Sequence, residues 1–166
     1  MNRRHLLSCL TPWALAPLLP SAVAEPAPQP VTQPALQPDA MMHTDAYWRA
    51  KLGTQQYQVL RQQGTERAFT SPLNAEKRAG TYHCAGCQAA LFTSAMKYDS
   101  GTGWPSFHSA LPGVLDTRMD FKAVYPRTEY HCLRCAGHQG HVFNDGPAPS
   151  GKRYCNNGVA LSFVAA

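Results

Sequence analysis

Two Cys-x-x-Cys pairs constrain the fold of this 166-residue chain more than any other feature. They are Cys84-Ala-Gly-Cys87 and Cys132-Leu-Arg-Cys135. The two-residue spacing lets both thiolates of a tight turn point at one ion, and two such turns supply the four sulfur ligands of a structural Zn²⁺ site. Because 44 residues separate the pairs, the fold of the domain must bring them together. A disulfide within each pair is the alternative in an oxidising compartment, and we favour zinc.

The pattern from Gly80 onward is that of a β domain. Short apolar or alternating runs are separated by Gly, Pro, Asn and Asp, which is typical of antiparallel strands joined by turns. The expected strands are Thr81–Cys84, Ala90–Thr93, Met119–Tyr125, Thr128–Cys132, His141–Phe143, Arg153–Cys155 and Val159–Val164. No helix-length segment separates them, which argues against a parallel α/β fold. We predict an antiparallel sandwich or open barrel.

Two short helices are expected before these strands. The first covers Asp45–Leu52, with Thr44 or Asp45 as its cap. The second covers Gln55–Gln63, with Thr54 as its cap and Gly64 at its end. Its apolar residues form one modest stripe, consistent with packing on the β domain.

The first 24 residues have the features of a cleaved signal peptide. Arg3 and Arg4 precede an uncharged run that closes with Ala22-Val23-Ala24, a small-x-small cleavage pattern. A transmembrane helix is the alternative, but three prolines interrupt the run. We therefore predict an exported, periplasmic protein, and the paired arginines resemble a twin-arginine signal.

Composition divides the rest of the chain in two. Residues 25–42 hold five prolines and almost no large apolar side chains, so they are expected to form an extended, disordered linker. The domain then occupies residues 43–166. Outside the signal, 13 basic residues face 10 acidic ones and form no basic stripe. Nucleic acid is therefore not an expected partner.

Cys9 lies in the expected signal peptide, so Cys155 is the one cysteine left over in the rest of the chain when the two pairs are set aside. An unpaired cysteine in an exported protein is a candidate reactive thiol, and a small buried apolar residue is the alternative. Arg153 lies two residues earlier, so the two side chains share a face if the segment is a strand. A guanidinium at that position favours the reactive thiolate.

Two histidines and one tryptophan add to this picture. His138 and His141 are followed by Asp145, and they could bind a metal, pack in the core or handle protons, the last being favoured. Trp104 lies in a Gly- and Pro-rich loop, where it either fills the core or presents its indole to a ligand.

Together these segments resemble the methionine-R-sulfoxide reductase B family, from about Tyr47 to Phe163. The motifs that carry the resemblance are Gly64-Thr-Glu-Arg-Ala-Phe69, the two Cys-x-x-Cys pairs, Asp99-Ser-Gly-Thr-Gly-Trp-Pro-Ser-Phe107, His138-Gln-Gly-His-Val-Phe-Asn-Asp-Gly-Pro147 and Gly151-Lys-Arg-Tyr-Cys-Asn-Asn157. The family fold is mainly β, with two antiparallel sheets in a tent- or barrel-like arrangement. The resemblance implies reduction of the R epimer of peptide-bound methionine sulfoxide.

The resemblance also implies a role for each candidate residue. Cys155 corresponds to the nucleophile, and Trp104 to the wall against which the substrate methyl packs. The polar cluster that holds the sulfoxide oxygen and supplies protons comprises His138, His141 and Asn157, supported by Asp145 and Arg153. The four paired cysteines correspond to the zinc ligands. A monomer acting on oxidised proteins or peptides is expected.

Three departures from the family pattern matter. Thr102 stands where many relatives carry a recycling cysteine, so we expect an external thiol, either a thioredoxin-like protein or a small thiol, to regenerate Cys155. Ala136-Gly137 stands where relatives usually have Asp-Ala, and Gln139 where they have an aliphatic residue.

Two other functions are compatible with parts of the pattern. A zinc-stabilised β interaction module would need the two knuckles but not Cys155, His141 and Asn157 together. A disulfide oxidoreductase would use one Cys-x-x-Cys pair but would want a βαβ context, which the sequence lacks.

Overall fold

The computed structural model describes residues 43–166. The expected signal peptide, residues 1–24, and the expected linker, residues 25–42, lie outside the described residues. Within the described part, no helix is long and apolar enough to cross a membrane.

Two short helices open the described chain, α1 (Asp45–Lys51) and α2 (Thr54–Gln62). Thr44 caps α1 by accepting a hydrogen bond from the Tyr47 amide, as expected. Thr54 is not a cap, because Gly53 holds that position and Thr54 is the first helical residue. Gln63, rather than Gly64, is the left-handed residue that ends α2, with φ of 57°.

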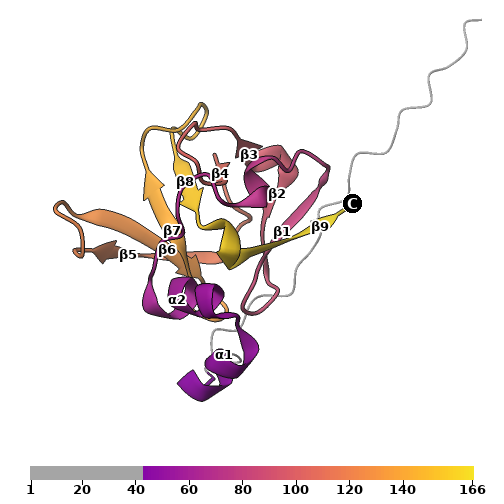
Figure 1. Ribbon diagram of the computed structural model, residues 1–166. Helices are drawn as coiled ribbons and strands as arrows, with labels where there is room; N and C mark the ends of the chain where they lie inside the picture. The colour runs from indigo at the N-terminus through magenta and orange to yellow at the C-terminus, as the bar shows by residue number, and fades with distance from the viewer. Residues whose placement is uncertain (1–42) are drawn as a thin grey trace, which may run out of the picture. The chain divides into compact units, whose positions relative to one another are not determined.

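The strands form two antiparallel sheets (Figure 1). The small sheet has the order β2-β1-β9, and the large sheet has the order β3-β4-β8-β7-β6-β5. The strands are β1 (Gly80–Cys84), β2 (Ala90–Thr93), β3 (Lys97–Tyr98), β4 (Ser106–Phe107), β5 (Leu115–Asp120), β6 (Arg127–Cys132), β7 (His138–Phe143), β8 (Arg153–Asn156) and β9 (Leu161–Ala165). Three 3₁₀ turns, Pro72–Asn74, Ser94–Met96 and Gly158–Ala160, complete the elements of residues 43–166. The predicted mainly β fold with two antiparallel sheets is confirmed.

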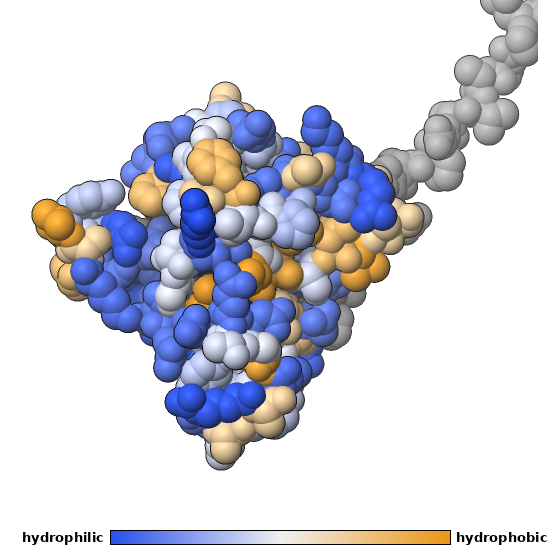
Figure 2. Space-filling model, in the orientation of Figure 1, coloured by the Kyte–Doolittle hydropathy of each residue, from blue (hydrophilic) through white to orange (hydrophobic). Residues whose placement is uncertain are grey.

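The sequence misplaced one strand and missed two. Met119–Tyr125 was expected to be a strand, but β5 ends at Asp120 and residues 121–126 form the turn of the β5–β6 hairpin. The apolar side chains in this turn suggested a buried strand, yet Phe121, Val124 and Tyr125 are all exposed. The end of this hairpin forms the apolar patch at the left edge of Figure 2. The two-residue strands β3 and β4 are too short to give a periodic signal.

An aromatic cluster between the two sheets forms the core. Phe92 of β2 stacks on Phe107 of β4, with ring centroids 4.1 Å apart, and Tyr82 of β1 meets the same ring edge-on at 5.0 Å. Tyr130 of β6 and Tyr154 of β8 extend the cluster. Because side chains alternate along a strand, the residues next to these aromatics face the other side of the large sheet.

Candidate active site and metal centre

One row of side chains crosses the large sheet on the face turned away from the aromatic core. Direct register partners place one residue of each strand in this row, in the order Tyr98, Ser106, Cys155, His141, Glu129, Arg118. Directly opposed residues on neighbouring strands have Cβ atoms about 5 Å apart. The pairing therefore places Cys155 directly opposite His141 on one face of the sheet, although 13 residues separate them in the sequence.

A cavity of about 100 Å³ opens at the centre of this row. Its walls are Thr65, Trp104, Arg127, Gly140, His141, Phe143, Cys155, Asn156 and Asn157. Four candidate residues, Trp104, His141, Cys155 and Asn157, therefore meet at one small, mostly apolar space. A larger hollow of about 660 Å³, beside the start of α2, contains none of these four.

His141 is held by a carboxylate that the sequence did not single out. Its Nε2 lies 2.7 Å from Asp120 Oδ2, which also accepts a hydrogen bond of 2.8 Å from Arg127 Nη2. The Lys122 amide, His141 and Arg127 hold the pKa of Asp120 well below its ordinary value, so it is ionised. Burial lowers the pKa of His141 despite this carboxylate, so the resting imidazole is mainly neutral at pH 7.

His138 lies behind His141 and does not line the cavity. The two rings meet edge-on, with centroids 5.4 Å apart. His138 Nδ1 lies 2.7 Å from Glu129 Oε1, and Arg118 forms two hydrogen bonds to the same carboxylate. Burial raises the pKa of Glu129, but the bonds from His138 and Arg118 outweigh it and bring the pKa to about 2.

The Cys155 thiol is partly buried and has two polar neighbours that stabilise its charge. Burial raises its pKa above the ordinary value, while the Arg153 guanidinium and the Thr102 hydroxyl act in the opposite direction. Thr102 belongs to a chain of hydroxyls in which Ser100 Oγ lies 2.8 Å from Thr102 Oγ1 and 2.7 Å from Ser106 Oγ. Cys155 is therefore held as a thiol, with groups beside it that favour its ionisation.

Asp145 and Arg153 lie at the edge of the site. They form a two-point ion pair of 2.8 Å for each bond. The Arg153 guanidinium also lies over the ring of Phe143, 4.3 Å from its centroid, and Phe143 lines the cavity. Asp145 thus orients the arginine that faces the thiol.

Glu66 connects Trp104 and Asn157, two of the residues that line the cavity. Its amide donates to Asn157 Oδ1 at 3.0 Å, and its carbonyl accepts from Trp104 Nε1 at 3.1 Å. Its carboxylate is buried and accepts hydrogen bonds from the amides of Gly158 and Val159. This network fixes the indole and the Asn157 side chain relative to each other.

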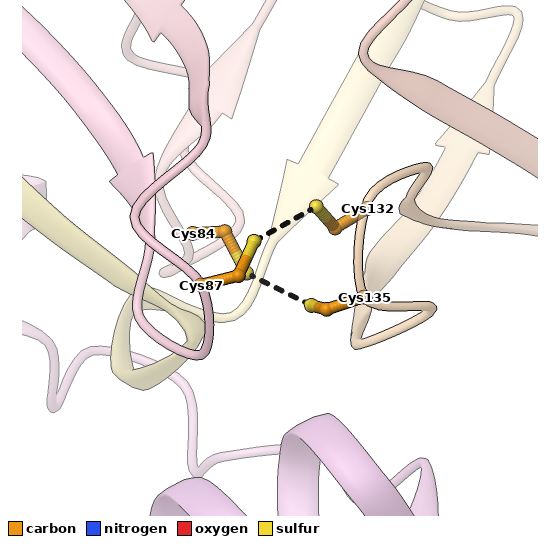
Figure 3. A group of neighbouring side chains, drawn as sticks. All are labelled: Cys84, Cys87, Cys132 and Cys135. Carbon is orange, nitrogen blue, oxygen red and sulfur yellow. Dashed lines mark hydrogen bonds between the residues drawn. The ribbon is translucent and has the colours of Figure 1, made fainter. Parts of the chain in front are cut away.

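The four paired cysteines form a buried cluster in which all four sulfur atoms lie within 4.8 Å of one another (Figure 3). Cys84 Sγ lies 3.7 Å from Cys135 Sγ, and Cys87 Sγ lies 3.5 Å from Cys132 Sγ. A tetrahedral ion with bonds of about 2.3 Å to sulfur separates its ligands by about 3.8 Å, whereas a disulfide requires about 2.05 Å. The cluster therefore fits a metal ion, and all four of its cysteines are free of disulfides in the structure.

Both knuckles have the same backbone design. In the first, the Cys84 carbonyl accepts from the amide of Gln88. In the second, the Cys132 carbonyl accepts from the amide of Ala136. Gln88 and Ala136 have left-handed φ of 61° and 55°, so each tight turn rests on a non-glycine residue. Both helices pack against this end of the domain: a Cβ on Gly137 would lie 3.0 Å from Leu60 of α2, and a Cβ on Gly86 would lie 3.6 Å from Trp48 of α1.

Sequence reasoning missed the residues that support the site. Asp120 and Glu129 hold the two imidazoles, Arg127 and Asn156 line the cavity, and Glu66 joins two of its walls. The signal for Glu66 and Asn156 was present, since both lie inside quoted motifs. Asp120 carries no local signal, because the hairpin that returns it to His141 is visible only in the fold.

The fold and the site together define a β domain with a four-cysteine cluster that fits a metal ion and with a fifth cysteine in a small cavity lined by an indole and an imidazole. The chain belongs to the SelR-domain family, whose model matches residues 52–165.

Three curated relatives carry the name peptide methionine sulfoxide reductase MsrB. The chain is 54% identical over 121 residues to that protein of Thiobacillus denitrificans, covering 72% of this chain and 92% of the relative. It is 50% identical over 121 residues to that of Leptospira interrogans, with the same coverages. It is 53% identical over 118 residues to that of Pseudomonas putida, covering 70% and 88%.

Proposed function

We propose that this protein reduces the R epimer of methionine sulfoxide in oxidised proteins or peptides. The observation that carries the proposal is the meeting of Cys155, Trp104, His141 and Asn157 at one cavity of about 100 Å³, which is large enough for a side chain. The family match supports the same reaction and does not favour a non-catalytic interaction module.

In the first half-reaction Cys155 attacks the sulfoxide sulfur. Charge grows on the sulfoxide oxygen, so this oxygen must receive a proton before it leaves sulfur. Neutral His141 takes the thiol proton and passes it on, while the carboxylate of Asp120 stabilises the imidazolium between the two transfers. The products are methionine, reduced by two electrons, and a Cys155 sulfenic acid, which carries the oxygen and the original thiol proton.

An external thiol completes the cycle. Thr102 replaces the recycling cysteine of many relatives, and among the described residues the other four cysteines are in the buried cluster. One thiol condenses with the sulfenic acid, so that an S–S bond forms and water leaves. A second thiol breaks that disulfide, restores the Cys155 thiol and leaves the two external thiols joined as a disulfide.

The epimer preference follows from the shape of the cavity. The sulfoxide sulfur is a stereocentre, so a pocket that fixes methyl, oxygen and side chain accepts one configuration. We assign the methyl to the Trp104 indole and the oxygen to the side of His141 and Asn157. Asn157 Nδ2 donates one hydrogen to the Gln139 carbonyl, which leaves the other for a ligand.

The metal is assigned as Zn²⁺, held by Cys84, Cys87, Cys132 and Cys135. Four thiolates in a buried tetrahedral arrangement suit structural zinc, which braces the fold and takes no part in the reaction. We also propose that residues 1–24 direct export and are removed. Recovery of a periplasmic protein beginning at Glu25 tests this, and an intact N-terminus would contradict it.

Separate turnover of R and S peptide sulfoxides tests the proposed activity. With dithiothreitol as reductant, the protein is expected to turn over the R substrate alone, and Cys155→Ser is expected to abolish that activity while keeping about one zinc per chain. Equal turnover of the S substrate would refute the epimer assignment. Residual activity in a zinc-loaded Cys155→Ser protein would refute the assigned nucleophile.

A further inference from the structure

Gln139 connects the four-cysteine cluster to the active site. It is fully buried, and its side-chain Nε2 lies 3.3 Å from Cys84 Sγ. The same nitrogen lies 3.5 Å from the Gly137 carbonyl, which accepts the Cys132 amide at 3.0 Å. One side-chain amide thus contacts the first knuckle directly and the second through one peptide group.

The main chain of Gln139 faces the catalytic side. Its carbonyl accepts both the backbone amide of Asn157, at 2.8 Å, and the Asn157 side-chain Nδ2, at 3.0 Å. The residue that touches a cluster sulfur therefore also holds the amide that lines the substrate cavity.

The Gln139 N–H···S hydrogen bond becomes strongly favourable when a metal is bound, because the cluster is then negatively charged. A divalent ion with four thiolates carries a net charge of −2, and a buried negative charge is stabilised by hydrogen-bond donors. The Gln139 amide is such a donor. Its Oε1, in contrast, is buried without a hydrogen-bond partner in the described structure, which is a cost that an aliphatic residue would avoid.

We propose that Gln139 is an outer residue of the metal centre, whose N–H···S hydrogen bond to Cys84 slows loss of the ion. The inference rests on metal binding by the cluster, proposed above, and goes beyond it by assigning a role to a residue that is not a ligand. It also explains why an amide occupies a position where the family usually carries an aliphatic side chain.

Gln139→Leu tests this because it should lower the retention of zinc without lowering the resistance of the protein to urea. Leu keeps similar bulk but lacks the donor, so transfer of zinc to a coloured chelator is expected to accelerate about tenfold. The zinc-loaded variant is expected to unfold at about the same urea concentration as zinc-loaded wild type, because Leu keeps the buried bulk and the unsatisfied Oε1 is gone. A replacement that only disturbs core packing would instead lower the resistance to urea.

Two further measurements keep the outcome decisive. If Gln139→Leu fails to fold, Gln139→Met removes the donor with an unbranched chain and carries the same expectation. Val114→Ala is the matched control, since Val114 is buried, its carbonyl accepts from the Leu133 amide of the second knuckle, and its side chain has no donor for a sulfur. It should lower stability with little change in zinc transfer. Unchanged or slower transfer in both Gln139 variants would overturn the proposal, whereas a wild-type protein that binds no zinc would overturn the metal assignment itself.

Discussion

Replacing Glu129 by Gln removes the buried charge that joins Arg118 to His138. The pKa of Glu129 is about 2 in the folded protein, against an ordinary value of 4.5. At 1.36 kcal/mol for each unit, this difference corresponds to about 3 kcal/mol of folding free energy. The carboxylate is buried, so solvent screens the interaction less than at a surface pair.

The loss of folding free energy in Glu129→Gln should depend on pH in a way that identifies the charge of Glu129 as its cause. Because the folded pKa is depressed, the stabilisation is complete above the unfolded pKa of about 4.5 and disappears as pH falls towards 2. Urea unfolding of wild type and Glu129→Gln should therefore differ by about 3 kcal/mol at pH 7 and converge in acid. Zinc loss at low pH affects both proteins and largely cancels in the difference.

Glu76→Gln is the control for this experiment. The pKa of Glu76 is also about 2, owing to its bonds with Arg78, but that arginine is 69% exposed and the pair is screened by solvent. A much smaller loss of stability is expected. A Glu129→Gln difference that stays constant from pH 7 to pH 3 would refute the electrostatic reasoning and leave only a packing defect.

Two predictions concern the thiol. Arg153→Gln removes the guanidinium that favours the thiolate, so the pKa of Cys155 should rise and the midpoint of iodoacetamide alkylation against pH should move upward; a midpoint that stays or falls would contradict the role given to Arg153. Thr102→Cys should place a second thiol beside Cys155, so one turnover with substrate should leave an intramolecular disulfide. A sulfenic acid still trapped by dimedone would show that position 102 cannot reach Cys155.

Local patterns predicted the parts of the fold that have strong local signals. The spacing of the cysteine pairs and the turn-bounded runs around Ala90–Thr93 and Thr128–Cys132 indicated a β domain with one four-sulfur cluster, and the structure agrees. The prediction for the β5–β6 turn was wrong because Phe121 and Val124 are apolar, as in a buried strand, yet are exposed. Hydrophobicity reports what a side chain prefers, and only the fold shows whether that preference is met.

The candidate site was predictable where function is concentrated in motifs and unpredictable where it depends on strand pairing. Cys155, His141 and Asn157 lie in short motifs, and the structure places all three at one cavity. Asp120 and Glu129 are ordinary acidic residues in their own segments. Their contacts with His141 and His138 arise only when β5 and β6 align beside β7.

Strand β5 is an edge strand of the large sheet, so the contacts that support catalysis at His141 should be lost more easily than the surroundings of the Cys155 thiol. A marginal strand pairs with one neighbour, so it opens at lower free energy than the strands inside. Detachment of β5 would take Asp120 from His141 and Arg118 from Glu129, while Cys155, three strands inward, kept its surroundings. Mild heat or denaturant should therefore abolish turnover while the protein still holds its zinc, keeps its core and has a Cys155 thiol that can be alkylated.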